Sequence, residues 1–130
     1  MIVLDASAAV EWLLQTSAGL QIERRIYSRS ESLHSPHLLD LEVASVLRRF
    51  VAAGRISPIR ADEALHDLLA LRIKRYPHDV LLERVWQLRH NLSPYDACYV
   101  CLAEDLRAPL LTHDARLSTA PGHQARIEVF

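Results

Sequence analysis

Short apolar runs alternate with longer amphipathic segments along the chain, and this alternation restricts the fold more than any other feature. The first run is Ile2–Leu4, which ends at Asp5, and a helical stretch from Ser7 to Leu14 follows at once. A buried strand that turns directly into a helix is typical of the start of an α/β unit. Strands separated by helices favour a parallel sheet with helices on both faces.

The remainder of the chain continues this alternation. The predicted strands are Ser32–Ser35, Pro109–Thr112 and Ile127–Phe130, while Leu71–Tyr76 fits either a helix end or a short strand. The predicted helices are Gly19–Ser28, His37–Ala53, one that starts at Ser57-Pro58, one from an Asp79 cap to about His90, and one from Ser93-Pro94 to Leu106. No internal repeat or linker is visible, so we expect one domain spanning residues 1–130.

Composition limits how this chain can handle phosphate. Its 130 residues include only three glycines, which are well separated. Walker loops and dinucleotide-binding turns need clustered glycines, so both are excluded, and phosphate must be met by side chains or a metal. The net charge of −1 argues against a simple basic clamp for nucleic acid. Two cysteines and no apolar run near the roughly 20 residues of a membrane span predict a cytoplasmic protein without membrane contact.

Four acidic residues lie where a parallel sheet binds its ligands, beyond the carboxyl ends of the strands or on helices next to them. Asp5 ends the first predicted strand, and Asp114 lies just past the strand Pro109–Thr112. Glu42 stands beside the apolar stripe of its helix, where a carboxylate must be paired or bound to metal. Asp96 lies in the first turn of a helix, where a capping role is a serious alternative. Each acid alone is more readily structural, but together they form a plausible oxygen-ligand site.

The chemistry of such a site is restricted. Clustered carboxylates repel one another unless cations neutralise them, and all-oxygen ligands suit Mg²⁺ or Mn²⁺ better than zinc. Such ions can activate water and stabilise the leaving oxygen of a phosphodiester. Ser7 and Thr112 add hydroxyls that either orient a ligand or water or make ordinary hydrogen bonds at a helix start and a strand end.

Four segments in a fixed order carry a family resemblance that covers nearly the whole chain. They are Ile2-Val-Leu-Asp5-Ala-Ser7, Leu39-Asp-Leu-Glu42-Val-Ala-Ser-Val-Leu47 with Gly54-Arg55-Ile56-Ser57 behind it, Leu92-Ser-Pro-Tyr95-Asp96-Ala97-Cys-Tyr99, and Ala108-Pro-Leu-Leu-Thr112-His-Asp114. With this spacing the chain resembles PIN-domain proteins and, among them, the VapC-type ribonuclease toxins of type II toxin–antitoxin pairs.

The resemblance implies an α/β fold and an activity. The fold would be a Rossmann-like three-layer sandwich with a mostly parallel sheet of strand order 3-2-1-4-5. The activity would be Mg²⁺-dependent (Mn²⁺ is the other candidate) endonucleolytic cleavage of RNA. A homodimer and a cognate VapB-type antitoxin, whose C-terminal segment occludes the active site, are also implied. The family's catalytic and metal-binding acids fall on Asp5, Glu42, Asp96 and Asp114, and its hydroxyls on Ser7 and Thr112. Asp5 and Asp96 would be the firmest ligands of the first metal.

Other readings remain open. A phosphotransfer domain of the haloacid-dehalogenase or receiver type also uses a strand-end aspartate. The dehalogenase pattern has a second aspartate where Ser7 stands, and both types need a late lysine, whereas the only lysine is Lys74. A PIN-domain nuclease without a toxin role, or a PIN-like RNA-binding module, is the other alternative. We expect Cys98 and Cys101 to be buried thiols, and His113 to be the only histidine placed to touch a substrate.

Overall fold

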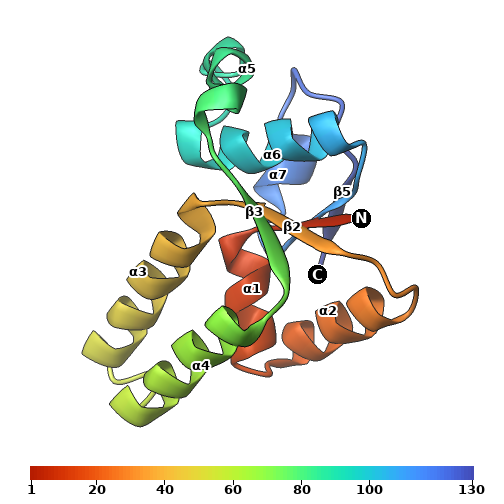
Figure 1. Cartoon of the computed structure of the whole chain (residues 1–130). Coiled ribbons are helices and arrows are strands. Elements are labelled where there is room, and N and C mark those ends of the chain that lie inside the picture. The colour runs from red at the N-terminus through yellow and green to blue at the C-terminus, as the bar shows by residue number, and fades with distance from the viewer.

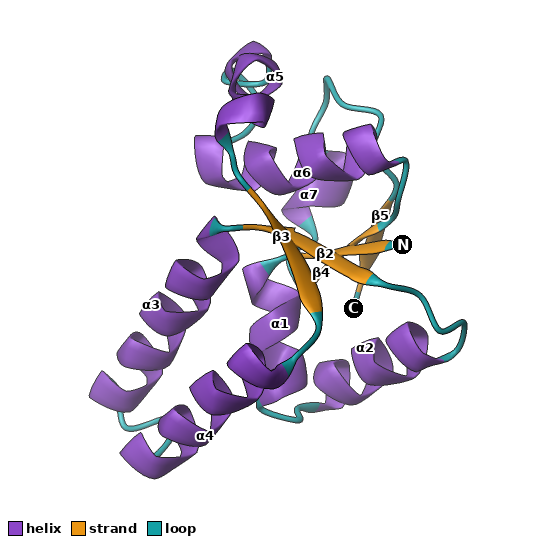
Figure 2. Cartoon of the chain, in the orientation of Figure 1, coloured by secondary structure: helices purple, strands orange, loops and turns teal.

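A five-stranded parallel sheet forms the centre of the computed structural model, which describes residues 1–130. The strands are β1 Ile2–Leu4, β2 Leu33–Pro36, β3 Ile73–Tyr76, β4 Leu110–Thr112 and β5 Ile127–Val129. Their order is β3-β2-β1-β4-β5, and every pair of neighbours is parallel (Figure 2). The expected strand order is therefore confirmed, and the sheet is parallel throughout.

The helices cover both faces of the sheet. They are α1 Ala6–Leu13, α2 Ser17–Tyr27, α3 Leu38–Ala52, α4 Pro58–Ala70, α5 Leu82–Gln87, α6 Pro94–Leu106 and α7 Arg116–Thr119, with a single 3₁₀ turn η1 at Asp79–Leu81. Figure 1 shows α5, α6 and α7 on one side of the sheet and α1 to α4 on the other. Three layers result, as the alternation of strands and helices predicts.

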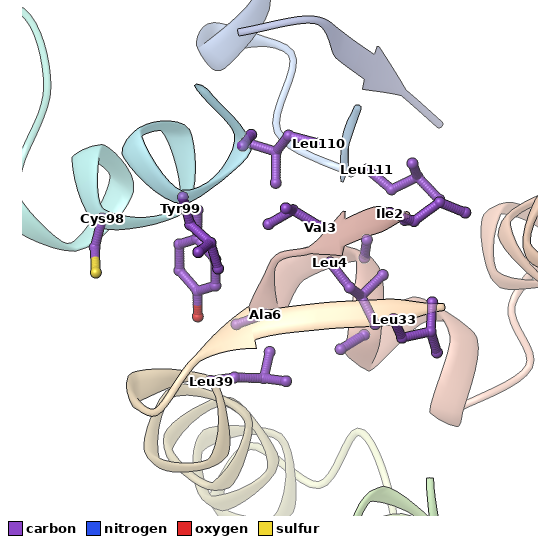
Figure 3. Close-up of a cluster of buried hydrophobic side chains, with 14 of the residues drawn as sticks. Ile2, Val3, Leu4, Ala6, Leu33, Leu39, Cys98, Tyr99, Leu110 and Leu111 are labelled. Atoms are coloured by element: carbon purple, nitrogen blue, oxygen red, sulfur yellow. The ribbon is translucent and has the colours of Figure 1, made fainter. Parts of the chain in front are cut away.

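Strand β1 occupies the middle of the sheet because its side chains are apolar on both faces. Ile2, Val3 and Leu4 are all fully buried, and Val3 pairs with His34 of β2 on one side and Leu110 of β4 on the other. A strand covered by helices on both faces reads as a continuous apolar run. The core around it is mostly aliphatic, and the Tyr99 ring reaches into it from α6 among smaller side chains (Figure 3).

Several local predictions need correction. Asp79 does not cap a long helix: it begins η1 without a side-chain cap bond, and a short α5 follows. The ambiguous segment Leu71–Tyr76 contributes β3, because pairing with β2 extends the backbone there. The one-turn helix α7 is too short for apolar periodicity to reveal it. No helix has the length and apolar character needed to cross a membrane.

Candidate active site

The site lies at the carboxyl edge of the sheet, where the chain reverses its direction of strand addition. From β1 the chain adds β2 and β3 on one side, and it then crosses to add β4 and β5 on the other. Such a switch point leaves a crevice beyond the carboxyl ends of the two central strands. Asp5 follows β1 directly, and Asp114 comes two residues after β4.

One cavity of about 230 Å³ brings all four predicted acids together. Its lining comes from four separate parts of the chain and consists of Asp5, Ala6, Ser7, Glu42, Ser45, Val46, Asp96, Tyr99 and Asp114. Thr112 does not line the cavity but lies behind it, fully buried. The sequence thus identified every acidic residue that lines the cavity. The roles of these residues in a reaction are a prediction.

Asp5 is the most buried of the four carboxylates, with 5% of its surface exposed. It caps the N-terminus of α1, where its Oδ1 accepts the Ala8 N–H at 2.9 Å and the Ser7 hydroxyl at 2.7 Å. Burial raises the pKa of Asp5 above its ordinary value, and the Ala8 hydrogen bond opposes that rise. The charge of Asp96 raises the pKa further. Asp5 therefore caps α1, and burial and the charge of Asp96 destabilise its ionised form.

The hydroxyls of Ser7 and Thr112 connect the ends of β1 and β4. Their oxygens lie 3.1 Å apart. The Ser7 hydroxyl also accepts the His113 backbone N–H at 2.8 Å, and the Thr112 hydroxyl accepts that of Asp114 at 2.9 Å. Because Ser7 gives its only hydrogen to Asp5, Thr112 is the donor between the two hydroxyls. The pair fixes the loop that carries Asp114 relative to Asp5.

Glu42 reaches the cavity from the second turn of α3. Its side chain is half-buried and accepts one hydrogen bond, from the Tyr99 hydroxyl at 3.1 Å. Burial raises the pKa of Glu42; the Tyr99 hydrogen bond opposes that rise, and the charges of Asp96 and Asp5 add to it. No basic side chain pairs with this carboxylate, so its charge is compensated only by a neutral donor.

Asp96 lies in the first turn of α6, but it is not the cap of that helix. The cap is Ser93, whose hydroxyl accepts the Asp96 backbone N–H at 3.2 Å. Burial raises the pKa of the Asp96 carboxyl, the Ser93 hydroxyl lowers it, and the neighbouring charge of Asp114 raises it. The cap bond of the helix is thus made without the Asp96 carboxylate, which lines the cavity instead.

Asp114 differs from the other three acids because it has a cationic partner. The Arg116 guanidinium pairs with its carboxylate and holds the pKa of Asp114 below its usual range. Arg116 also lowers the pKa of Asp96, so one exposed arginine offsets part of the negative charge of the cavity. Arg116 is thus the cation that acts on both Asp96 and Asp114.

The oxygen donors of the cavity suit a hard divalent cation. Three carboxyl groups with raised pKa values share a small space, and a divalent cation would relieve that repulsion. No group of three or more His, Cys, Asp or Glu side chains lies in a geometry that could hold a metal ion. Mg²⁺ commonly binds through one or two carboxylates and completes its shell with water, so three converging protein ligands are not required. Asp5, Glu42 and Asp96 are available for this role, since none of the three has a basic partner in direct contact, whereas Asp114 is paired with Arg116.

Three polar residues of the site were not singled out from the sequence. Ser45 lines the cavity, Tyr99 contacts Glu42 across it, and Arg116 pairs with Asp114. Tyr99 follows Asp96 by three residues on the same helix, which is the spacing that places two side chains on one face. His113 does not line the cavity; its ring bonds the Phe130 carbonyl oxygen, which holds the end of the chain against β4. Cys98 and Cys101 are buried free thiols, as expected.

The fold and the cavity define a three-layer α/β protein with a carboxylate site at the switch point of its sheet. The PIN domain model matches residues 2–122, and the chain belongs to the PIN domain family. It is 46% identical over 128 residues to ribonuclease VapC1 of Mycobacterium tuberculosis, covering 98% of this chain and 96% of that protein. It is 42% identical over 129 residues to ribonuclease VapC12 of the same species, covering 99% and 98%.

A solved structure shares the fold. PAE2754 from Pyrobaculum aerophilum superposes with a TM-score of 0.70 at 25% identity, over 91% of this chain and 84% of that one. The family resemblance drawn from the four segments is therefore confirmed, and within the PIN domain family the chain groups with the VapC ribonucleases.

Proposed function

We propose that this protein is a metal-dependent endoribonuclease and acts as the toxin of a VapBC-type pair. The observation that carries the proposal is the single cavity at the switch point, lined by Asp5, Glu42, Asp96 and Asp114 from four separate segments. Membership in the PIN domain family and the ribonuclease names of VapC1 and VapC12 support it.

The protein's own residues would prepare the site for hydrolysis. Asp5 and Asp96 would hold Mg²⁺ or Mn²⁺, while Glu42 and Asp114 would complete the acidic wall. When bound, the cation supplies Lewis acidity and charge neutralisation for attack of water on a phosphodiester. Ser7 keeps Asp5 fixed because its hydroxyl donates to Oδ1 on one side and accepts the His113 N–H on the other. No side-chain nucleophile is needed.

Cleavage of RNA by the purified protein tests this proposal. We expect cleavage with Mg²⁺, none with EDTA, and a loss of at least about a hundredfold in Asp5→Asn and Asp96→Asn. Asp105→Asn is the matched control, since Asp105 is an exposed acid on the same helix as Asp96 but outside the cavity. Equal cleavage by the wild type and both cavity variants would contradict the assignment and leave an RNA-binding module as the better reading.

The toxin role needs its own test. Expression of the free protein should arrest growth, whereas the Asp5→Asn form should not. Co-expression with a VapB-type antitoxin, whose C-terminal segment would occlude the cavity, should restore growth. Growth that continues with the wild type would contradict the toxin role, although a nuclease without that role would remain.

A homodimer is part of the proposal, and an exposed apolar face supports it. Leu82 and Tyr95, each more than half exposed, line an apolar cavity of about 270 Å³ between α5 and the start of α6, and the equally exposed Val80 and Trp86 lie on the neighbouring η1 and α5. Exposed apolar side chains gathered in one place are typical of an interface. Trp86→Glu should therefore shift the protein from dimer to monomer in light scattering. Leu69→Glu, at an equally exposed leucine on α4, should leave the dimer intact.

A further inference from the structure

We propose that Tyr99 is a positioning residue that holds the Glu42 carboxylate in the acidic cavity and so sets the affinity of the site for a divalent cation. This inference rests on the metal site of the proposed function. It concerns a contact between α6 and α3, two helices on opposite sides of the sheet (Figure 1).

The Tyr99 side chain is fixed by its surroundings. It is 2% exposed and belongs to the buried apolar cluster of the sheet. In Figure 3 the Tyr99 ring extends from α6, and its hydroxyl points toward Ala6 and Leu39. These two residues lie where β1 and β2 lead into α1 and α3. A packed ring cannot turn away from its partner, so the hydroxyl is a rigid donor.

The hydroxyl has one partner, and that partner is Glu42. The only hydrogen bond of the Tyr99 side chain runs to Glu42 Oε2 at 3.1 Å. A phenylalanine would fill the same apolar space without bringing a polar atom into the core, so packing alone does not explain the hydroxyl. Burial raises the pKa of Tyr99 far above its ordinary value, so the hydroxyl remains a donor at every physiological pH.

Glu42 in turn depends on this one contact for its position. It is half-buried, has no basic partner, and receives no other hydrogen bond. A glutamate side chain has several rotatable bonds and loses much freedom when it is held in one place. Repulsion from Asp5 and Asp96 would turn the carboxylate out toward solvent if the Tyr99 donor were absent. Hydrogen bonds to carboxylates around a metal orient them, and removing one commonly weakens metal binding about 10- to 100-fold.

Binding of Mn²⁺, followed by the electron paramagnetic resonance signal of the free ion, tests the inference without RNA. Tyr99→Phe should raise the Kd for Mn²⁺ about tenfold while the protein stays folded. Tyr76→Phe is the matched control, because its hydroxyl also makes one hydrogen bond, to His34 Nδ1 at 2.7 Å, on a strand outside the cavity. That variant should bind Mn²⁺ as the wild type does.

A double-mutant cycle shows whether Tyr99 acts through Glu42. In a Glu42→Gln background, Tyr99→Phe should change the Kd no further, since the contact no longer orients a charge. Glu42→Asp keeps the negative charge and leaves Tyr99 in place, but it shortens the acidic side chain. This variant should weaken Mn²⁺ binding by a similar factor, and it tests the inference even if Tyr99→Phe fails to fold. Unchanged binding in Tyr99→Phe or Glu42→Asp, or an equal loss in both backgrounds of the cycle, would overturn the inference.

The outcomes separate the inference from the proposed function. If the wild type binds no Mn²⁺, the metal-dependent function and the inference fall together. If the wild type binds Mn²⁺ and Tyr99→Phe weakens that binding, but the wild type does not cleave RNA, the proposed function is wrong while the positioning role stands. If cleavage is metal-dependent and Tyr99→Phe binds normally, only the inference is wrong.

Discussion

Arg116 pairs with Asp114 through both its backbone and its side chain. Asp114 Oδ1 accepts the Arg116 backbone N–H at 3.0 Å and the guanidinium Nε at 2.9 Å, and the other carboxylate oxygen contacts a terminal guanidinium nitrogen. The two residues are only two positions apart, and the arginine side chain is exposed. Asp114 is therefore the one acid of the cavity whose charge is already compensated within the protein.

Removing Arg116 should tighten divalent cation binding. In Arg116→Ala the pKa of Asp114 would rise toward its ordinary value, and the carboxylate would be free to turn to a cation. The favourable electrostatic interaction between Arg116 and the Asp96 carboxylate would also be lost. We expect a severalfold lower Kd for Mn²⁺, measured at low ionic strength, where exposed charges are least screened.

A second arginine provides the control for this experiment. Arg126 is also exposed and pairs with a carboxylate two residues away, Glu128, at 3.2 Å. Arg126→Ala should leave the Kd for Mn²⁺ unchanged, because neither residue lines the acidic cavity. Equal effects in both variants would mean that only the net charge matters.

Loss of the Ser7 hydroxyl should weaken both the fold and the site. Ser7→Ala removes the 2.7 Å hydrogen bond to Asp5 and leaves the His113 N–H without its acceptor. We expect a loss of about 1–2 kcal/mol in the free energy of unfolding and weaker Mn²⁺ binding, because Asp5 is no longer held. Urea unfolding and Mn²⁺ titration measure the two effects. Ser28→Ala, which removes an exposed hydroxyl bond to the Arg25 carbonyl at the C-terminal end of α2, should leave Mn²⁺ binding unchanged.

The sequence identifies the fold and the acids because both follow local rules. Ile2–Leu4 is wholly apolar since β1 is covered on both faces, and Asp5 follows it at the edge where parallel sheets bind ligands. Ser93-Pro94 marks the start of α6 because a capping hydroxyl and an N1 proline both favour a helix start. These signals lie within a few residues of the feature they predict.

The residues that the sequence did not reveal depend on tertiary contacts. Tyr99 lies 57 positions from Glu42, and nothing in its neighbourhood shows that its hydroxyl faces that acid. Within Leu71–Tyr76, residues Ile73–Tyr76 form a strand through their pairing with β2. Asp79 has the composition of a helix cap, but the chain forms a 3₁₀ turn there and its carboxylate makes no cap bond. In β3 and at Asp79, tertiary packing overrides the local secondary-structure propensity.

Gly19 should tolerate no side chain, because it packs directly against the backbone of α1. A Cβ at Gly19 would come within 1.9 Å of the Glu11 carbonyl oxygen, which is backbone and cannot move aside. Gly19→Ala should cost about 2 kcal/mol or more, measured by thermal unfolding. Gly54→Ala is the control: its φ of +70° strains an alanine by about 1 kcal/mol, but nothing lies within 4 Å of the added atom. A larger loss at Gly54 than at Gly19 would contradict this account.

Neutralising a cavity acid should stabilise the metal-free protein. Burial raises the pKa values of Glu42 and Asp96 in the folded state. Between the unfolded and the folded pKa the native protein binds more protons, so stability falls as the pH rises through that interval. Above that interval the penalty is present in full, and Asp96→Asn or Glu42→Gln removes it. The gain should be at most about 1 kcal/mol each, because solvent screens half-buried charges.

The pH and metal dependence of this gain distinguish it from a general packing effect. Near pH 4 the wild-type carboxyls bind protons, so the difference in Tm between wild type and Asp96→Asn should shrink. Saturating Mg²⁺ should reverse the order, since only the wild type keeps both proposed ligands and gains stability from binding. Glu31 and Glu104, whose lowered pKa values favour the folded state above pH 5, are common to both proteins and cancel in the difference. Asp105→Asn should show no such dependence, and a constant difference at all pH values would show that cavity charge is not its cause.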